Sequence, residues 1–500
     1  MATRSTAMKA SLAAEAQDAD FDDELLAPTR MLLFAPLGST DMPSAIVHRL
    51  RAAIGLGLLP DGKRLPKEAD LASELGVTTF ALREALAELR NQGLLVTKAG
   101  KYGGSFVTYP ADSEQLEQDE LIELSSAELR DVGDWRQMLA AHAAALAAQR
   151  ASESNIKMLG AYATRVKEAQ SSLDARRAHG RFLLELAASA QSMRMTRAEF
   201  AVHEQIDWLF GLVLQTPQER AASAAGLTDI AEAVRSRDPQ KAQADTEAYI
   251  SRLLARLARL RFERIAAQRD QNRATGSATL AGEIAVIVDG LLDVLGGIAD
   301  DTGPALAAGG TFASVRSQLS LAALRRIEEF PAFVKGMGII AEVGVVPDHP
   351  YWIQWWQRTE TGPLADNHHV LDPTREDFYD YESREFVDIP RRERVPCAYG
   401  PYIDYGGVDD FDLTITAPIV VDDVFYGVSC ADILVADLES WLSPLLAAEG
   451  ESYLINADGR VIVSNSATHG AGDLMTVDDG FEVHEFAPFG WRLLTRSTAD

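Results

Sequence analysis

The stretch from Arg64 to Val107 constrains the fold more than any other part of the chain. Pro66 is expected to open a short helix that ends at Gly76, because the residue just past a helix end often needs a positive φ. Thr78 can cap a second helix, in which apolar residues recur at helical spacing up to Gly93. Two helices joined by such a tight turn predict a helix-turn-helix.

The residues on either side extend this prediction. Two short strands are expected after Gly93, at 94–97 and 105–109, around the glycine-rich hairpin tip 98–104. A further helix is expected before the turn, from Met42 to Gly55. Together these elements predict a winged helix-turn-helix, an α+β module that lays its second helix in the major groove of DNA.

The motifs LP-x-E, LA-x-x-LGV, LREAL-x-x-L and G-x-x-GG-x-FV resemble the GntR family of bacterial transcriptional regulators. The resemblance implies binding of operator DNA through Arg64, Lys67, Thr78, Thr79, Arg83, Lys98 and Lys101. Two positions depart from it, because Ala69 and Thr79 stand where the family usually has arginine. Since arginine is the side chain that reads guanine with two hydrogen bonds, the sequence preference of this module is open.

The charge of the chain is unevenly distributed. The net charge is −27, but residues 41–110 carry nine Lys or Arg against seven acids, so this segment is +2 and the remainder is −29. An acidic body repels phosphate except where the basic module is presented. DNA binding is therefore expected to be salt-sensitive and to require two modules together, in a homodimer.

Length and composition predict three domains after a flexible arm at 1–40. These are the winged helix at 41–110, an all-helical bundle at 111–270, which is rich in Ala, Leu and Arg, and a strand-rich domain at 281–500. Two cysteines are too few for a disulfide framework. With no expected membrane span or signal peptide, the chain is expected in the cytoplasm.

The helical segment resembles the FCD subfamily of GntR regulators. Many FCD domains hold a divalent metal with one Asp and three His, and the matching positions here are His179, Leu183, Leu227 and Tyr249. Leucine cannot ligate a metal, so no metal is expected. His179 is interpreted as an ordinary helix-surface histidine, and the bundle as a dimerisation and relay body.

The region 281–500 resembles a Cache sensor domain, a PAS-like α+β fold with an antiparallel sheet. The likeness rests on the segments DPTREDFY, AYGPYID, LTITAPI, FYGVSCADI and YLINADGRVIVSN. It implies a small-molecule pocket lined by Trp352, Trp355, Trp356, Glu376, Tyr379, Tyr402, Asp404 and Asp432. The tryptophans are expected on a helix, and the alternative is that they are core anchors while Asp404 and Asp432 are turn or strand-end residues.

The ligand class follows from a comparison with amino-acid-binding Cache domains. In those domains an R-x-[WF]-Y motif supplies an arginine for the ligand carboxylate, but Glu376 occupies that position here, and Arg375 is one residue out of register. Aromatic faces with carboxylates suit an ammonium group. A small amine, polyamine or quaternary ammonium compound is therefore favoured, and an amino acid becomes the alternative if Arg375 enters the pocket.

Catalytic interpretations have little support. No G-x-S-x-G elbow or P-loop is present, so no cofactor and no enzymatic activity are expected. Asn367-His368-His369 is interpreted as a solvated loop rather than a metal site. Two alternatives stay open: a GntR module fused to a metabolic enzyme, for which Lys335 is the only lysine after Lys241, and a ligand-independent repressor that acts through protein contacts.

Overall fold

The computed structural model describes residues 42–100, 103–109, 113–272, 279–309, 311–313, 315–316, 333–358, 365–367, 369–376, 378–404, 411–446 and 450–496. The chain forms two compact units. The N-terminal unit extends to Glu123 and includes Asp131–Leu257, whereas the C-terminal unit consists of Leu124–Arg130 and the chain from Ala258. The division falls inside two long helices, which are α7 (Ser126–Arg150) and α12 (Pro239–Asn272).

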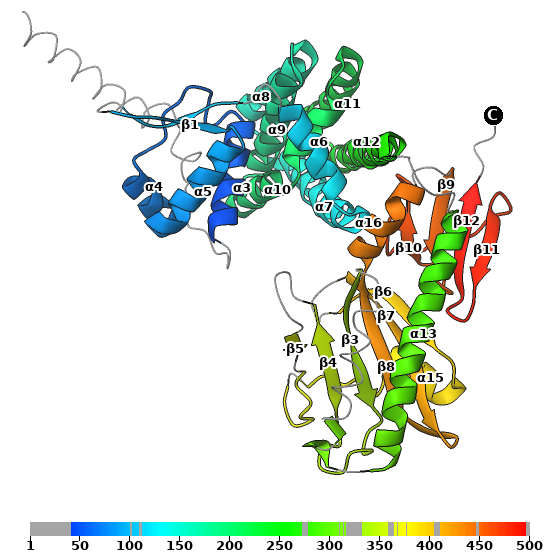
Figure 1. Ribbon diagram of the computed structural model, residues 1–500. Coiled ribbons are helices and arrows are strands. Elements are labelled where there is room, and N and C mark those ends of the chain that lie inside the picture. Colours follow the sequence, from blue (N-terminus) through cyan, green and yellow to red (C-terminus); the bar gives the residue numbers. More distant parts are fainter. Residues whose placement is uncertain are drawn as a thin grey trace, which may run out of the picture. The chain divides into compact units, whose positions relative to one another are not determined.

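The N-terminal unit begins with the expected winged helix (Figure 1). Its elements are α3 (Met42–Gly55), α4 (Glu68–Leu75), α5 (Thr79–Asn91), β1 (Leu95–Lys98) and β2 (Gly104–Val107). Gly76 ends α4 with a φ of 66°, and the Thr78 side chain caps α5 by accepting a hydrogen bond from the Ala81 amide at 3.2 Å. The turn between the two helices therefore forms as the sequence predicts.

The rest of the N-terminal unit is helical. It contains α6 (Ser113–Glu123), most of α7, α8 (Glu153–Glu168), α9 (Ser172–Ser189), α10 (Met193–Gln205), the 3₁₀ helix η1 (Asp207–Val213), α11 (Pro217–Arg235) and the first part of α12. Side chains of Ser152, Ser171, Ser192 and Thr216 cap the helices that follow them. Phe200 of α10 is buried in the core of the winged helix, so the two parts share apolar packing.

The C-terminal unit contains two antiparallel sheets. The larger has the order β5-β4-β3-β8-β7-β6, and its strands are β3 (Val334–Ala341), β4 (Ile353–Gln357), β5 (Ala365–Asn367), β6 (Cys397–Ile403), β7 (Phe411–Val421) and β8 (Val424–Leu434). The smaller has the order β10-β9-β12-β11, with strands β9 (Glu451–Ile455), β10 (Val461–Ser464), β11 (Glu482–Phe486) and β12 (Trp491–Arg496). Helix α16 (Val435–Leu446) connects the two sheets.

Each face of the larger sheet has its own apolar core. The helix α13 (Leu280–Ala307) packs along one face (Figure 1), where Leu291 and Leu295 join the residues of β7 and β8. The other face is covered by α15 (Glu385–Glu393) and the segment before it, with Tyr381 and Phe386 buried against the sheet. Because both faces are covered, the central strands β3, β7 and β8 are buried along most of their length.

Two expectations about local structure are wrong. The tryptophans predicted on a helix lie on or beside strand β4, and His179, predicted on a helix surface, is fully buried in α9. Asp422 and Asp423 form the turn between β7 and β8 with φ of 49° and 62°, and Gly459 has a φ of 83° in the turn between β9 and β10. Within the described residues, no helix is both long and apolar enough to cross a membrane.

Candidate DNA-binding surface and ligand site

Helix α5 presents one polar face to solvent. Ala81, Leu82, Ala85, Leu86 and Leu89 are buried in the winged-helix core, so the opposite side of the helix faces outward. Thr79, Phe80 and Arg83 are exposed. Thr78 is also exposed, but its hydroxyl oxygen accepts the capping hydrogen bond and is already engaged.

Arg83 is held by an acid in the structure. Its Nε lies 2.7 Å from Oε2 of Glu68, the glutamate of the LP-x-E motif, and both side chains are largely exposed, at 69% and 44%. An exposed pair of this kind contributes little to stability. Arg83 can therefore exchange Glu68 for a phosphate or a base at small cost.

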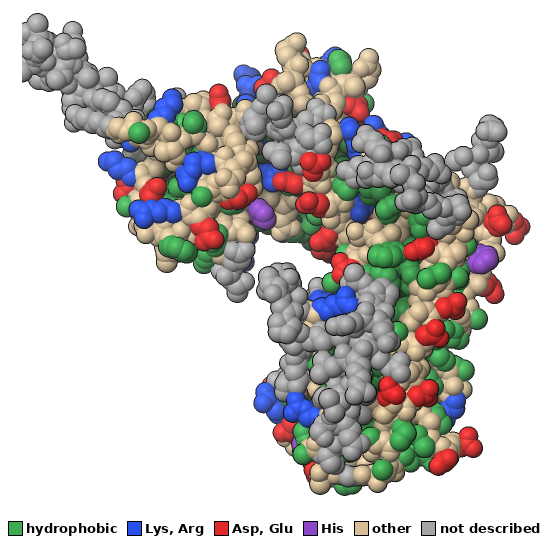
Figure 2. Space-filling view, viewed as in Figure 1, with side chains coloured by type: hydrophobic (Ala, Val, Ile, Leu, Met, Phe, Trp, Pro, Cys, Tyr) green, Lys and Arg blue, Asp and Glu red, His purple; other side chains and the backbone are tan. Residues whose placement is uncertain are grey.

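Other basic residues surround this helix. Lys67 is exposed just before α4, and the Arg64 guanidinium Nε is 2.9 Å from the point where a Cβ at Gly104 would lie, beside the wing. Lys98 Nζ lies 4.5 Å from the centre of the Phe106 ring, and the predicted Lys101 lies outside the described residues. Figure 2 shows Lys and Arg side chains mixed with Asp and Glu over the winged helix.

The four positions that match the FCD metal site are all buried. The rings of His179 and Tyr249 have their centroids 5.9 Å apart, and the Tyr249 hydroxyl lies 2.6 Å from Ser223 Oγ. Burial and the charge of Arg136 lower the pKa of His179 to about 3. With leucine at positions 183 and 227 and the phenol engaged by Ser223, these residues do not fit a metal ion.

A buried ring of ionisable residues lies beside His179 and was missed in the sequence. Arg136 Nη1 is 2.6 Å from Glu199, and Arg136 Nη2 is 3.2 Å from Asp207. His203 contacts both carboxylates, with its Nε2 3.3 Å from Glu199 and its Nδ1 against Asp207. Glu199, His203 and Asp207 follow one another at intervals of four residues, which places them on one side of α10 and the start of η1. This spacing is the feature of the sequence from which the group could have been predicted.

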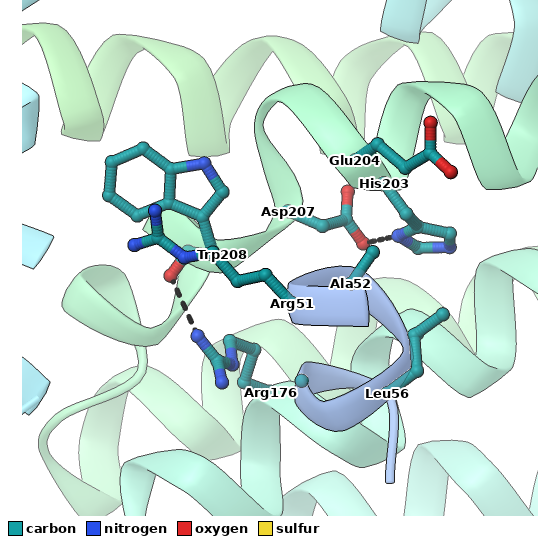
Figure 3. Close-up of a pocket in the computed structure, with 9 residues that line it drawn as sticks. Arg51, Ala52, Leu56, Arg176, His203, Glu204, Asp207 and Trp208 are labelled. Carbon is teal, nitrogen blue, oxygen red and sulfur yellow. Dashed lines mark hydrogen bonds and ion pairs between the residues drawn. The ribbon is translucent and has the colours of Figure 1, made fainter. Parts of the chain in front are cut away.

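A small cavity lies next to this ring, where α3 meets the helical part of the same unit (Figure 3). Arg51 pairs with both oxygens of Glu120 at 2.8 and 2.6 Å, and its guanidinium lies 4.5 Å from the centre of a Trp208 ring. Arg176 donates to the Trp208 carbonyl at 3.1 Å. The volume is about 20 Å³, which suits one water molecule and no metabolite.

Strand β4 separates the predicted tryptophans. Trp352 and Trp356 point to the core shared with α13, which is the role of core anchors that the sequence left open. Trp355 points to the opposite face, with Tyr379 and Cys430. There its ring covers Gly336, where an added Cβ would be only 2.6 Å from Trp355 Nε1. Only Trp355 therefore lies on the same face as the predicted tyrosines.

Predicted polar residues do come together on that face. The Tyr402 hydroxyl lies 2.9 Å from Thr414 Oγ1, which in turn donates to Asp432 Oδ1 at 2.8 Å. Asp404 and Tyr379 are buried as well. Burial, followed by the charges of Asp404 and Asp432, raises the pKa of Tyr379. Tyr402 and Asp432 are thus linked through Thr414, and burial together with the charges of Asp404 and Asp432 raises the pKa of both Tyr379 and Tyr402.

A third carboxylate in this group was missed. Asp412 alternates with Thr414 along β7 and is fully buried, and neither of its oxygens has a hydrogen-bond partner among the described residues. Burial and the charge of Asp432 raise the pKa of Asp412 to about 7. Burial likewise raises the pKa of Asp432 to about 7. We call Asp404, Asp412 and Asp432 the carboxylate cluster.

The remaining predicted residues lie apart from the cluster. Glu376 is exposed in a turn, and so is Arg375. His368 lies outside the described residues, while His369 is half-buried, with its ring centroid 5.0 Å from that of Tyr379, instead of in a solvated loop. Among the described residues, no three His, Cys, Asp or Glu side chains are placed to hold a metal ion.

Comparison with known proteins agrees with the winged helix. Residues 43–107 match the model of the bacterial regulatory proteins of the gntR family, and residues 131–252 match the FCD domain. RmpR of Mycobacterium gastri, named as an HTH-type transcriptional regulator, is 34% identical over 229 residues, which cover 45% of this chain and 83% of RmpR. The chain belongs to the GntR family. This GntR protein is thus a transcriptional regulator with an FCD domain.

Other similar proteins cover smaller parts or differ more. The HTH-type transcriptional regulator SmoD of Agrobacterium fabrum is 36% identical over 101 residues, which are 19% of this GntR regulator and 42% of SmoD. E. coli McbR/YncC is 18% identical, with a TM-score of 0.26, over 44% of this chain and 98% of that one. The extracellular domain of the histidine kinase soHK1S-Z6 is 18% identical, with a TM-score of 0.31, over 47% of this chain and 95% of that domain.

Proposed function

We propose that this regulator binds operator DNA as a homodimer and senses a small cationic metabolite of the cytoplasm through its C-terminal unit. In this proposal, residues 41–110 bind DNA, residues 111–270 form the dimer body, and residues 281–500 are a Cache-like sensor. No enzymatic step is part of it. The carboxylate cluster carries the sensing part of the proposal.

The DNA-binding part is supported by the exposed face of α5. Arg83 lies on this face, Lys98 on the wing and Arg64 beside the wing, so positive side chains flank the helix that would enter the major groove. Because the chain outside residues 41–110 carries a net charge of −29, a single basic module is weak, and two modules on a two-fold-symmetric operator are required.

The sensing part is supported by the chemistry of the cluster. The charge of Lys335 lowers the pKa of Asp412 and Asp432, but burial and the neighbouring carboxylates outweigh it and raise the pKa of both to about 7, so a further positive charge would stabilise the ionised group. The Trp355 and Tyr379 rings lie on the same face, and the Arg384 guanidinium lies 5.9 Å from the centre of the Tyr379 ring, so this face already attracts a cation. An ammonium group satisfies both features.

An amino acid remains the competing ligand. Its carboxylate needs a cation, and Arg375, the residue next to the family position, is exposed in a turn. Calorimetry on the full chain with putrescine and L-ornithine, which differ by one carboxylate, separates the two classes. Putrescine is expected to bind more tightly, and binding of ornithine alone would contradict the proposal.

Two further measurements complete the test. Asp404→Asn should abolish putrescine binding, while Asp478→Asn, an exposed acid of the same unit, should not change it. Selection of operator DNA from a random pool, followed by anisotropy with and without putrescine, tests the link between the two ends of the chain. An operator affinity that no metabolite alters would favour the ligand-independent repressor instead.

A further inference from the structure

Phe80 occupies an unusual environment for a phenylalanine. It is 78% exposed, the highest value among the large apolar side chains that the structure describes. Its neighbours Ala81 and Leu82 are buried in the winged-helix core, so α5 cannot rotate to bury Phe80 without exposing them. Because single exposed apolar side chains are common on protein surfaces, the place of Phe80 in the helix-turn-helix decides what it contacts.

The position of Phe80 in the helix indicates which contact. It is the second residue of α5, next to the exposed Thr79, and Arg83 follows three residues later on the same face. In a helix-turn-helix, the N-terminal residues of the second helix reach the base edges. Phe80 has no hydrogen-bond donor, so it cannot be a phosphate contact.

The major groove offers one apolar feature, the C5 methyl group of thymine, which Phe rings and Thr methyl groups contact. We propose that Thr79 and Phe80 read a thymine methyl group in each half-site of the operator. This inference rests on the proposed operator binding. Where the family usually has an arginine that can read guanine, Thr79 and Phe80 instead make apolar contact with a methyl group.

The removal of single methyl groups from DNA tests the inference directly. In the selected operator, each thymine is replaced in turn by deoxyuridine, which lacks only the methyl group. For the full-length wild-type protein, replacement of the contacted thymine in one half-site should weaken binding about fourfold, the value expected for one buried methyl group. Fluorescence anisotropy at constant salt measures the change.

Protein variants connect the effect to Phe80. Phe80→Ala should reduce the difference between the thymine and deoxyuridine operators well below fourfold, and Thr79→Ala combined with Phe80→Ala should abolish it, because both contacts with the methyl group are then lost. Met138→Ala, which truncates a side chain that is 65% exposed on α7, should keep the fourfold difference. Unchanged melting temperatures for these variants confirm that the fold is intact.

Three outcomes are decisive. If the operator binds but no deoxyuridine replacement weakens binding, the inference is wrong and the proposed function stands. If Phe80→Ala keeps the full methyl sensitivity, Phe80 is not the reader, and the inference is again wrong. If no operator is selected at all, the proposed function fails, and methyl reading fails with it.

Discussion

Glu439 of α16 forms a buried ion pair with Arg261 of α12, with 2.6 Å between carboxylate and guanidinium and exposures of only 1% and 4%. The same carboxylate accepts hydrogen bonds from the amide and hydroxyl of Ser126, at 2.8 and 2.7 Å, and thereby caps the first turn of α7. All three residues belong to the C-terminal unit, but α7 and α12 continue into the N-terminal unit.

Glu439→Gln is expected to destabilise the C-terminal unit by about 3–5 kcal/mol, because Arg261 would remain buried without its counter-charge. Urea titration followed by tryptophan fluorescence measures this, since five of the seven tryptophans lie in that unit. Asp478→Asn breaks an exposed pair with Arg496 and should cost at most about 1 kcal/mol. Equal losses in both variants would mean that the Glu439 pair has no special role.

Arg83→Ala should weaken operator binding while leaving the melting temperature nearly unchanged, because its pair with Glu68 is exposed. Glu68→Gln should strengthen binding, since Arg83 would no longer need to leave an acid. Lys98→Ala is expected to reduce the slope of log affinity against log salt by about 1. Wild-type affinity in Arg83→Ala would contradict the proposed docking.

The pH dependence of putrescine binding follows from the carboxylate cluster. A cation binds the ionised carboxylates, and the pKa of Asp432 is about 7, so affinity should rise about tenfold between pH 6 and pH 8 for each group that must ionise. Calorimetry in buffers of different ionisation enthalpy should detect proton release on binding. An affinity independent of pH over this range would exclude Asp412 and Asp432 as ligand contacts.

Stability should depend on pH in the opposite direction. The folded pKa of Asp412 and of Asp432 lies above that of an unfolded aspartate, so the folded chain binds more protons and stability falls as pH rises from about 4 to 7. Asp412→Asn should flatten this fall. Asp478→Asn should not, since a Gly480 amide and Arg496 lower the pKa of Asp478.

Gly226→Ala should destabilise the helical domain by about 1–3 kcal/mol, because the new Cβ would lie 2.6 Å from Tyr249 Cδ2. Gly160→Ala provides the matched control: this helical glycine has no atom within 4 Å of the added Cβ, so it should gain about 0.5–1 kcal/mol. In a Tyr249→Leu background the penalty at Gly226 should largely vanish. Thermal unfolding of the four variants tests this.

Metal analysis of dialysed full-length protein should find no stoichiometric zinc, nickel or manganese in the helical domain, since Leu183 and Leu227 cannot ligate and Tyr249 is bonded to Ser223. A bound ion that disappears in His179→Ala would overturn this expectation.

The winged helix could be predicted from sequence because its signals are local. The cap at Thr78 and the positive φ at Gly76 depend on neighbouring residues only. The tryptophans were misassigned because positions 352, 355 and 356 have helical spacing. In the strand, the same spacing sends Trp352 and Trp356 to one face and Trp355 to the other.

The candidate site was only partly predictable, because its members meet through long-range pairing. Tyr402 and Asp432 followed from motif positions, whereas Asp412 joins them only through the register that sets it beside Tyr402 and Leu434. His179 was misplaced for a similar reason: its burial depends on Phe210 and Tyr249, which lie 31 and 70 residues further along the chain. Local patterns do not carry such contacts.

The buried group of His179, Leu183, Leu227 and Tyr249 also limits which single substitutions the helical domain tolerates. Building the family's metal site here would require ligating side chains at Leu183, Leu227 and Tyr249 together. A ligating side chain introduced alone at Leu183 or Leu227 would bury a polar group without a metal, at a cost of about 1–3 kcal/mol. A metal site at these positions would therefore need several substitutions at once, because each of them alone destabilises the helical domain.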